Sequence, residues 1–143
     1  MELRIRLLLS RDDWYHQRGY WVLASALRDA GIEVVLGGIQ TPEEIVQTAI
    51  QEDVDIIGYR IMDAAPKILL PILFDTMKAE EIADMPVVVG GIIPQADELI
   101  IKKIGVKEVF HPFNTLEMIV EKIKTIVLES RRQRDRNERL ISD

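Results

Sequence analysis

Several residue types are absent or scarce in this chain, and each absence removes a class of function. The sequence has no cysteine, which excludes a disulfide framework, a thiolate metal site and a cysteine nucleophile. It contains no uncharged apolar run of about 18 residues, so no segment is expected to span a membrane. Basic residues do not predominate, because the net charge is −6, and a nucleic-acid partner is therefore not expected.

The N-terminal segment also lacks the apolar core of a signal peptide. Glu2, Arg4 and Arg6 are spaced through its apolar residues, whereas a signal peptide needs an uninterrupted apolar stretch. A cytoplasmic location is the resulting expectation. Histidine is scarce as well, since the chain has two, His16 and His111. These are its two candidates for an imidazole metal ligand.

A regular alternation of strand-like and helix-like segments fills most of the chain. Its 143 residues, 48% hydrophobic and 29% charged, fit one soluble globular domain. Apolar runs predict strands at 3–9, 32–36, 54–58, 86–89 and 106–110. Apolar residues at helical spacing predict helices at 20–30, 41–50, 67–82, 95–104 and from 115 onward. The second helix begins with a capping box, Thr41 with Glu44 three residues later.

This strict alternation predicts a parallel sheet with helices on both faces, joined by right-handed crossovers. The predicted fold is one α/β domain, a doubly wound, flavodoxin-like sheet with the strand order 2-1-3-4-5. The domain is expected to end near residue 128, because the chain becomes rich in charge from Glu129 to Asp143. We interpret 129–143 as a charged C-terminal extension, either a solvated helical end or a docking arm for a partner protein.

In this topology the connections after strands one, three, four and five meet at one edge of the sheet, where ligands bind. We expect these connections at 10–19, 59–66, 90–94 and 111–114. The first holds His16, two aspartates and two aromatic residues, although a surface loop whose aromatics cover the sheet edge is an alternative interpretation. Gly90 and Gly91 allow close backbone approach to a ligand, or else form a plain turn.

Three common kinds of site are not supported by the spacing of residues. The first and fifth strands are three spacings apart, about 14 Å, so His16 and His111 are not expected to share a zinc ion with Asp12 or Asp13. Ser10 and His16 lie in one loop without the arrangement of a Ser-His-Asp triad. No phosphate-binding glycine pattern follows the first strand, which argues against dinucleotide and P-loop sites.

Five stretches of the sequence carry a resemblance to a known family. They are Arg18-Gly19, ALRDAGIEV at 26–34, QTPEEIV at 40–46, EDVDIIG at 52–58 and VGGIIP at 89–94. Residues 3 to 127 resemble the cobalamin-binding domain, or small subunit, of adenosylcobalamin-dependent acyl-CoA mutases such as methylmalonyl-CoA mutase. The resemblance implies a Rossmann-like cobalamin-binding fold, adenosylcobalamin as cofactor and carbon-skeleton isomerisation as the reaction.

The resemblance also implies roles for individual residues. Family members carry an aspartate-x-histidine-x-x-glycine motif whose histidine is the lower ligand of cobalt, and His16 and Gly19 match its second half. Trp14 stands at the aspartate position, so Asp13, one residue earlier, is the possible orienter of His16. No catalytic residue is implied. The implied cofactor-binding residues are Asp13, His16, Gly19, Arg60, Met62, Gly90, Gly91 and His111, with His16 as the metal ligand.

The chain departs from the family where small residues make room for the nucleotide tail of the cofactor. Tyr15, Arg60, His111 and Phe113 are large at such positions, and they must either turn outward or fill the groove. Two hypotheses follow. The chain is a cobalamin-carrying subunit, inactive alone and paired in a hetero-oligomer with a larger barrel subunit that binds acyl-CoA. Alternatively it is a degenerate member that has lost cobalamin and acts as an assembly subunit of a larger complex.

Overall fold

A five-stranded parallel sheet forms the centre of the molecule. The computed structural model describes residues 3–142. The strands, in chain order, are β1 (Arg6–Arg11), β2 (Glu33–Ile39), β3 (Ile56–Ile61), β4 (Val87–Gly91) and β5 (Glu108–Phe110). They lie side by side in the order β2-β1-β3-β4-β5, which confirms the predicted flavodoxin-like topology.

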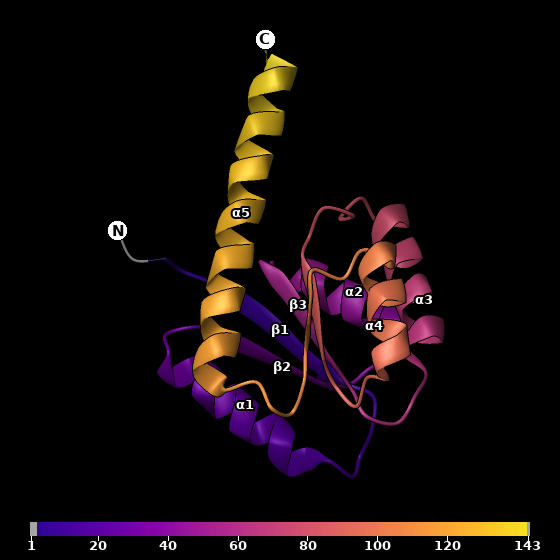
Figure 1. Cartoon of the computed structure of the whole chain (residues 1–143). Helices are drawn as coiled ribbons and strands as arrows, with labels where there is room; N and C mark the ends of the chain where they lie inside the picture. The colour runs from indigo at the N-terminus through magenta and orange to yellow at the C-terminus, as the bar shows by residue number, and fades with distance from the viewer. Residues whose placement is uncertain (1–2, 143) are drawn as a thin grey trace.

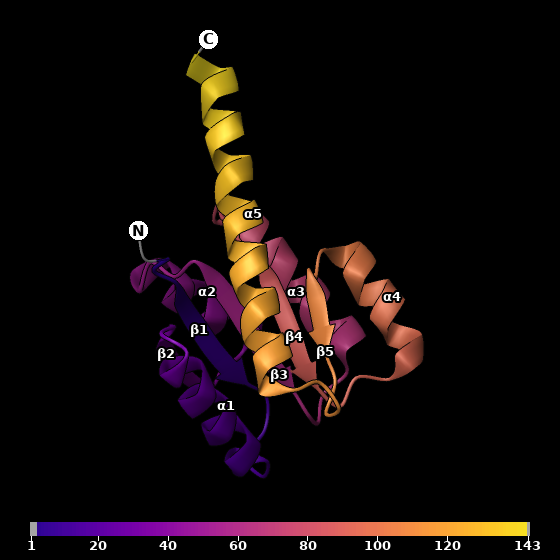
Figure 2. The same cartoon turned by 60° about the vertical axis from the view of Figure 1, so that its left-hand side comes forward.

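Helices cover both faces of the sheet, as Figures 1 and 2 show. They are α1 (Gln17–Asp29), α2 (Pro42–Gln51), α3 (Pro66–Ala79), α4 (Gln95–Ile104) and α5 (Leu116–Ser142). Helices α1 and α5 pack on one face, and α2, α3 and α4 pack on the other. Right-handed crossovers explain why α1 lies on the opposite face from α2, α3 and α4. The chain moves in one direction along the sheet from β1 to β2, and in the other direction from β2 through β3 and β4 to β5.

Each face of the sheet has its own hydrophobic core, because successive side chains of a strand point to opposite faces. Leu7 and Leu9 of β1 join α1 and α5, whereas Leu8 between them joins α2 and α3. The predicted capping box of α2 is present: the Thr41 hydroxyl accepts from the Glu44 N–H at 3.2 Å, and the Glu44 carboxylate accepts from the Thr41 N–H at 2.9 Å.

Several strands reach further toward the ligand edge than the sequence predicted. Ser10 and Arg11 continue β1, and they are in register with Tyr59 and Arg60 of β3. Arg60 in turn faces Gly90 of β4. The predicted loops at 10–19, 59–66 and 90–94 therefore begin too early, because ladder hydrogen bonds use backbone groups and continue where the side chains turn polar. Arg60, Gly90 and Gly91 thus lie on rigid strands.

Helix α5 extends beyond the sheet whose face it covers. It continues as one helix through the charged segment and rises away from the sheet in both views (Figures 1 and 2). Arg131 fastens it to the domain by donating to the Arg4 carbonyl and pairing with Asp55 at 3.4 Å, and residues 132–141 are exposed. No helix within residues 3–142 has the length and apolar character that a membrane span requires.

Candidate functional site

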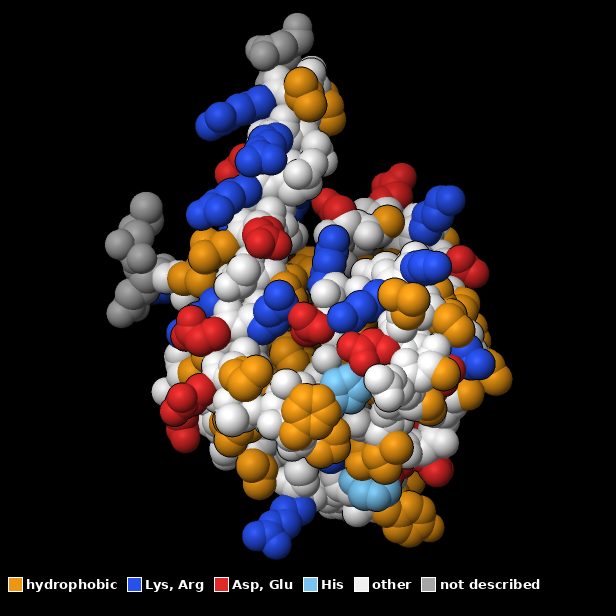
Figure 3. Space-filling view, in the orientation of Figure 1, with side chains coloured by type: hydrophobic (Ala, Val, Ile, Leu, Met, Phe, Trp, Pro, Cys, Tyr) orange, Lys and Arg blue, Asp and Glu red, His pale blue; other side chains and the backbone are white. Residues whose placement is uncertain are grey.

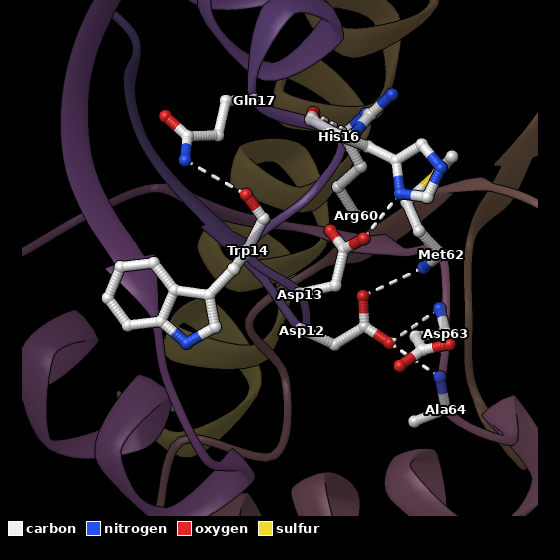
Figure 4. Close-up of polar contacts among 9 residues, drawn as sticks. All are labelled: Asp12, Asp13, Trp14, His16, Gln17, Arg60, Met62, Asp63 and Ala64. Carbon is white, nitrogen blue, oxygen red and sulfur yellow. Dashed lines mark hydrogen bonds and ion pairs between the residues drawn. The ribbon is translucent and has the colours of Figure 1, made fainter.

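His16 lies at the ligand edge of the sheet, in the connection between β1 and α1. It directly precedes the first residue of α1, and its side chain makes no hydrogen bond that caps the helix. The imidazole is 48% exposed. Figure 4 shows that it points toward the Asp13 carboxylate. The ring is therefore accessible from outside the protein while one of its nitrogens is held from within.

Asp13 holds His16 through Nδ1. The Asp13 side chain is 3% exposed, and its Oδ2 contacts the Nδ1 atom of His16. A carboxylate on one ring nitrogen fixes the orientation and the tautomer of the imidazole, leaving the other nitrogen as the ligand atom. Nε2 of His16 is thus the nitrogen available to a metal. The spacing of three residues places the two side chains together even though Trp14 occupies the family's aspartate position.

Asp12, in the same loop, binds backbone groups rather than His16. Its carboxylate accepts hydrogen bonds from three consecutive backbone N–H groups: Met62 at 2.8 Å, Asp63 at 3.0 Å and Ala64 at 2.7 Å. Figure 4 shows this fan of contacts beside the Asp13–His16 pair. Asp12 therefore ties the connection after β1 to the connection after β3, which supports the loop that carries His16.

Three large aromatic residues of the connections after β1 and β5 are exposed. Trp14, Tyr15 and Phe113 are 69%, 88% and 80% exposed, and Figure 4 shows the Trp14 indole directed away from the Asp13–His16 pair. The Trp14 carbonyl is held by the Gln17 side-chain amide at 2.9 Å. In Figure 3 hydrophobic side chains gather around the pale-blue histidines on the lower part of the face shown. These three aromatic residues leave the interior of the site unfilled.

A pocket of about 290 Å³ opens beside this loop, between the sheet and helices α1 and α5. Its volume is close to the lower end of the range for ligand pockets, about 300 Å³. Aliphatic side chains from the sheet, α1 and α5 form most of its wall. The predicted cofactor residues that line it are Gly19, Arg60, Met62, Gly90, Gly91 and His111. Asp13 and His16, the other two, lie at the loop beside it.

Glycines create the space for this pocket. Gly58 and Gly90 occupy neighbouring strands on the α1/α5 face, and both line the pocket. A Cβ at Gly90 would meet only ordinary contacts, the nearest being the Phe110 carbonyl oxygen at 3.7 Å. Gly91 differs, since its φ is +114° and a Cβ would lie 2.2 Å from the Ile61 carbonyl oxygen. Sequence reasoning missed Gly58, although a glycine inside a strand signals such close approach.

Arg60 lines the pocket and contacts the loop that carries His16. Its Nη1 donates to the His16 carbonyl at 2.9 Å. A Cβ on Gly19 would lie 2.4 Å from Nη2 of Arg60, so the glycine allows the guanidinium to lie against α1. Burial lowers the pKa of Arg60 from its ordinary value, and the nearby Asp13 carboxylate partly opposes this effect. Arginine still remains a cation at neutral pH.

His111 belongs to the far wall of the pocket, after β5. Its Nε2 lies 2.9 Å from Oε2 of Glu98 in α4, and its ring stacks on Phe113 with centroids 5.3 Å apart. The hydrogen bond from His111 lowers the pKa of Glu98. Across the described residues 3–142, no three histidine, aspartate or glutamate side chains cluster as a metal site. A metal at His16 would therefore depend on a cofactor for its other ligands.

Residues 7–120 of the chain match the B12-binding domain. The chain belongs to the B12-binding domain family. This confirms the resemblance on which the implied residue roles depend. The matched segment contains β1 to β5, the His16 loop and every residue of the pocket wall through His111.

Curated relatives include small subunits of acyl-CoA mutases. The chain is 39% identical over 113 residues to the 2-hydroxyisobutanoyl-CoA mutase small subunit of Aquincola tertiaricarbonis, covering 78% of this chain and 83% of that one. It is 37% identical over 120 residues to the pivalyl-CoA mutase small subunit of Xanthobacter autotrophicus, covering 83% and 80%. It is also 36% identical to methylmalonyl-CoA mutase of Cereibacter sphaeroides, covering 81% of this chain but 16% of that one.

Solved structures show how widely the fold is used. A cobalamin-binding protein from Desulfitobacterium hafniense superposes with a TM-score of 0.70 at 18% identity, covering 86% of this chain and 59% of that one. A Francisella response-regulator receiver domain superposes equally well, with a TM-score of 0.69 at 13% identity, covering 89% and 99%. These likenesses establish the fold, and function must be argued from the site.

Proposed function

We propose that this chain is the cobalamin-carrying small subunit of an adenosylcobalamin-dependent acyl-CoA mutase. His16 would hold the cobalt through Nε2, with Asp13 orienting its imidazole. The pocket between the sheet and helices α1 and α5 would hold the nucleotide tail of the cofactor. One observation carries the proposal: the Asp13–His16 pair stands beside an open pocket lined by Gly19, Gly90 and Gly91.

The residues of the chain bind and orient, and they leave the reaction itself to the cofactor. When bound, adenosylcobalamin supplies the radical that begins a carbon-skeleton rearrangement. Asp13 contacts Nδ1 of His16, which leaves Nε2 as the nitrogen that could bind cobalt. Asp12 ties the loop to the backbone after β3, and Arg60 donates to the His16 carbonyl. No side chain of this chain is assigned a proton transfer or a covalent step.

A larger subunit completes the proposed enzyme. The relatives named as small subunits match this chain over most of their length, whereas in methylmalonyl-CoA mutase the matching segment is 16% of the chain. A domain of this size therefore accompanies a much larger remainder, and we propose that a separate barrel subunit binds the acyl-CoA. Co-expression with such a chain and size-exclusion chromatography tests this proposal, which predicts co-elution at micromolar concentration.

The alternative, an assembly subunit without cofactor, depended on large side chains filling the groove. Trp14, Tyr15 and Phe113 point outward instead, and the pocket is open. These observations favour the cobalamin-binding hypothesis. Arg60 and His111 remain large residues in the pocket wall, and each is held by a specific partner rather than packed across the space.

Visible absorption of corrinoids tests the proposal directly. Titration with aquocobalamin and adenosylcobalamin should give the spectrum of a base-off, histidine-ligated cofactor. His16→Ala should lose that spectrum, because it removes the nitrogen ligand, while Arg132→Met, far along α5, should retain it. No spectral change with millimolar cobalamin would instead favour the assembly subunit.

A further inference from the structure

Arg60 is a cation that forms no ion pair among residues 3–142, although the Asp13 and Asp12 carboxylates act on it from a longer distance. Its one direct hydrogen bond joins Nη1 to the His16 carbonyl, a neutral acceptor. A guanidinium has five N–H donors, so most of the donors of Arg60 are not used by the hydrogen bond to His16.

The surroundings of Arg60 suit the binding of an anion by these free N–H donors. The residue is half-buried and lines the pocket, whose other walls are largely aliphatic. Among the lining residues Arg60 is the one with a permanent charge. Arg11, its register partner on β1, adds a second positive group beside it. A partly desolvated guanidinium recognises phosphate strongly, through two parallel N–H donors.

Gly19 lets Arg60 reach the path between the pocket and His16. The guanidinium lies where a side chain on Gly19 would be, against the first turn of α1, which contains no acidic residue. Cobalamin carries one phosphodiester in the tail that joins its corrin to its nucleotide base. Arg60 contacts the His16 carbonyl and lines the pocket, so a tail that ran from a corrin at His16 into the pocket would pass near it. The phosphodiester is the one anionic group of that tail.

We propose that Arg60 binds the phosphodiester of the cobalamin nucleotide tail and couples that contact to the placement of His16 through its hydrogen bond to the His16 carbonyl. This inference rests on the proposed function. It assigns Arg60 as a specificity-determining residue that favours corrinoids with a complete, phosphate-bearing tail over corrinoids without one.

Corrinoids that differ by the phosphate test the inference. Cobinamide lacks the whole nucleotide, and cobinamide phosphate restores the phosphate alone. The wild-type protein should bind cobinamide phosphate about 10-fold more tightly than cobinamide, as expected for a charge-assisted hydrogen bond. Arg60→Met should make the two affinities equal, and Arg60→Lys should keep part of the difference. Arg132→Met removes one distant positive charge and should keep all of it.

The readout separates this inference from the proposed function. Dissociation constants come from visible titration, and thermal unfolding of each variant verifies that it is folded. Equal binding of both cobinamides by the wild type, or an equal change in both affinities in Arg60→Met, would overturn the role of Arg60 while leaving cobalamin binding intact. Failure of the wild type to bind any corrinoid would overturn both. Weaker His16 ligation of cobinamide phosphate in Arg60→Met would support the coupling.

Discussion

The two faces of the sheet are built from the same strands but differ in how completely they are packed. On the α2/α3/α4 face, Ile57, Tyr59, Val87 and Val89 meet fully buried side chains such as Leu73. On the α1/α5 face, the alternate positions include Gly58 and Gly90, and a pocket of about 290 Å³ remains. Both faces have a buried core, but the α1/α5 face also leaves a pocket that a ligand could fill.

This difference follows from a pattern with a period of two. In β4, Val87 and Val89 face the α2/α3/α4 core and Val88 faces the α1/α5 core. Gly90 follows on the α1/α5 face, where it lines the pocket. Protein interiors normally leave few voids. The void at this edge, lined by glycine and aliphatic residues, therefore fits the proposed cofactor site. Each prediction below changes one face and measures whether the other responds.

Leu73→Ala tests the packed face. Leu73 is fully buried in α3, and its truncation should lower the free energy of unfolding by about 2–5 kcal/mol because it leaves a cavity. Leu23→Ala, in α1 beside the pocket, should cost less, since part of that side chain borders open space. Urea unfolding measures both values. Equal losses would show that the two faces are packed alike.

Gly90→Val tests the hollow face. A valine is favourable in a strand, and a Cβ here has space on the protein side, so the variant should fold with nearly unchanged stability. Its side chain projects into the pocket, and cobalamin affinity should fall by about 100-fold through steric exclusion. Titration monitored by absorption gives the affinity, and thermal unfolding gives the stability. Unchanged affinity would place the nucleotide tail elsewhere.

Asp13→Asn tests how the site is oriented rather than how it is shaped. The substitution keeps the size of the side chain but weakens its contact with Nδ1 of His16. Loss of a carboxylate that orients a metal-bound histidine typically lowers metal affinity about 10-fold to 100-fold. The pocket is unaffected, so binding should weaken while the tail-dependent preference between corrinoids persists. The control is Asp135→Asn on the exposed part of α5.

Glu98→Gln tests the contact between the faces, and its effect should be the smallest. Glu98 in α4 holds His111 in the pocket wall, and this hydrogen bond lowers the pKa of Glu98. The stabilisation is present above the ordinary carboxyl pKa and is lost as the pH falls through the lower folded value. The variant should therefore lose up to about 1 kcal/mol near neutral pH and nothing in strong acid. Unfolding curves at both pH values measure it.

The sequence predicted the architecture well because the apolar pattern is strong. All five strands, their order and the helix Gln95–Ile104 agree with the structure. The ends of β1, β2, β3 and β4 were wrong by two to three residues, because residues such as Arg11, Gly38 and Gly91 pair through backbone groups that carry no hydropathy signal. Predicted boundaries therefore failed where strands reach the site.

The candidate site was predicted less completely. The resemblance implied roles for His16 and the glycines, and it named Asp13 as the possible orienter of His16. The structure places Asp13 in contact with His16, which the sequence alone could not show because the loop conformation also depends on Asp12 binding the backbone of 62–64. It also could not show the direction of Trp14, Tyr15 and Phe113, which are exposed. Side-chain direction at a loop is decided by tertiary contacts that no local spacing records.

Helix α5 joins the pocket wall to a point well outside the domain. Its first turns, with Leu116, Ile119 and Ile123, line the pocket, and the same unbroken helix of 27 residues ends at Ser142. At about 1.5 Å per residue it is about 40 Å long, so a tilt of about 5° at the pocket displaces its tip by about 3.5 Å. A spin label at Leu140, near the exposed end of the helix, would therefore report a small tilt of the pocket wall as a displacement of about 3 Å.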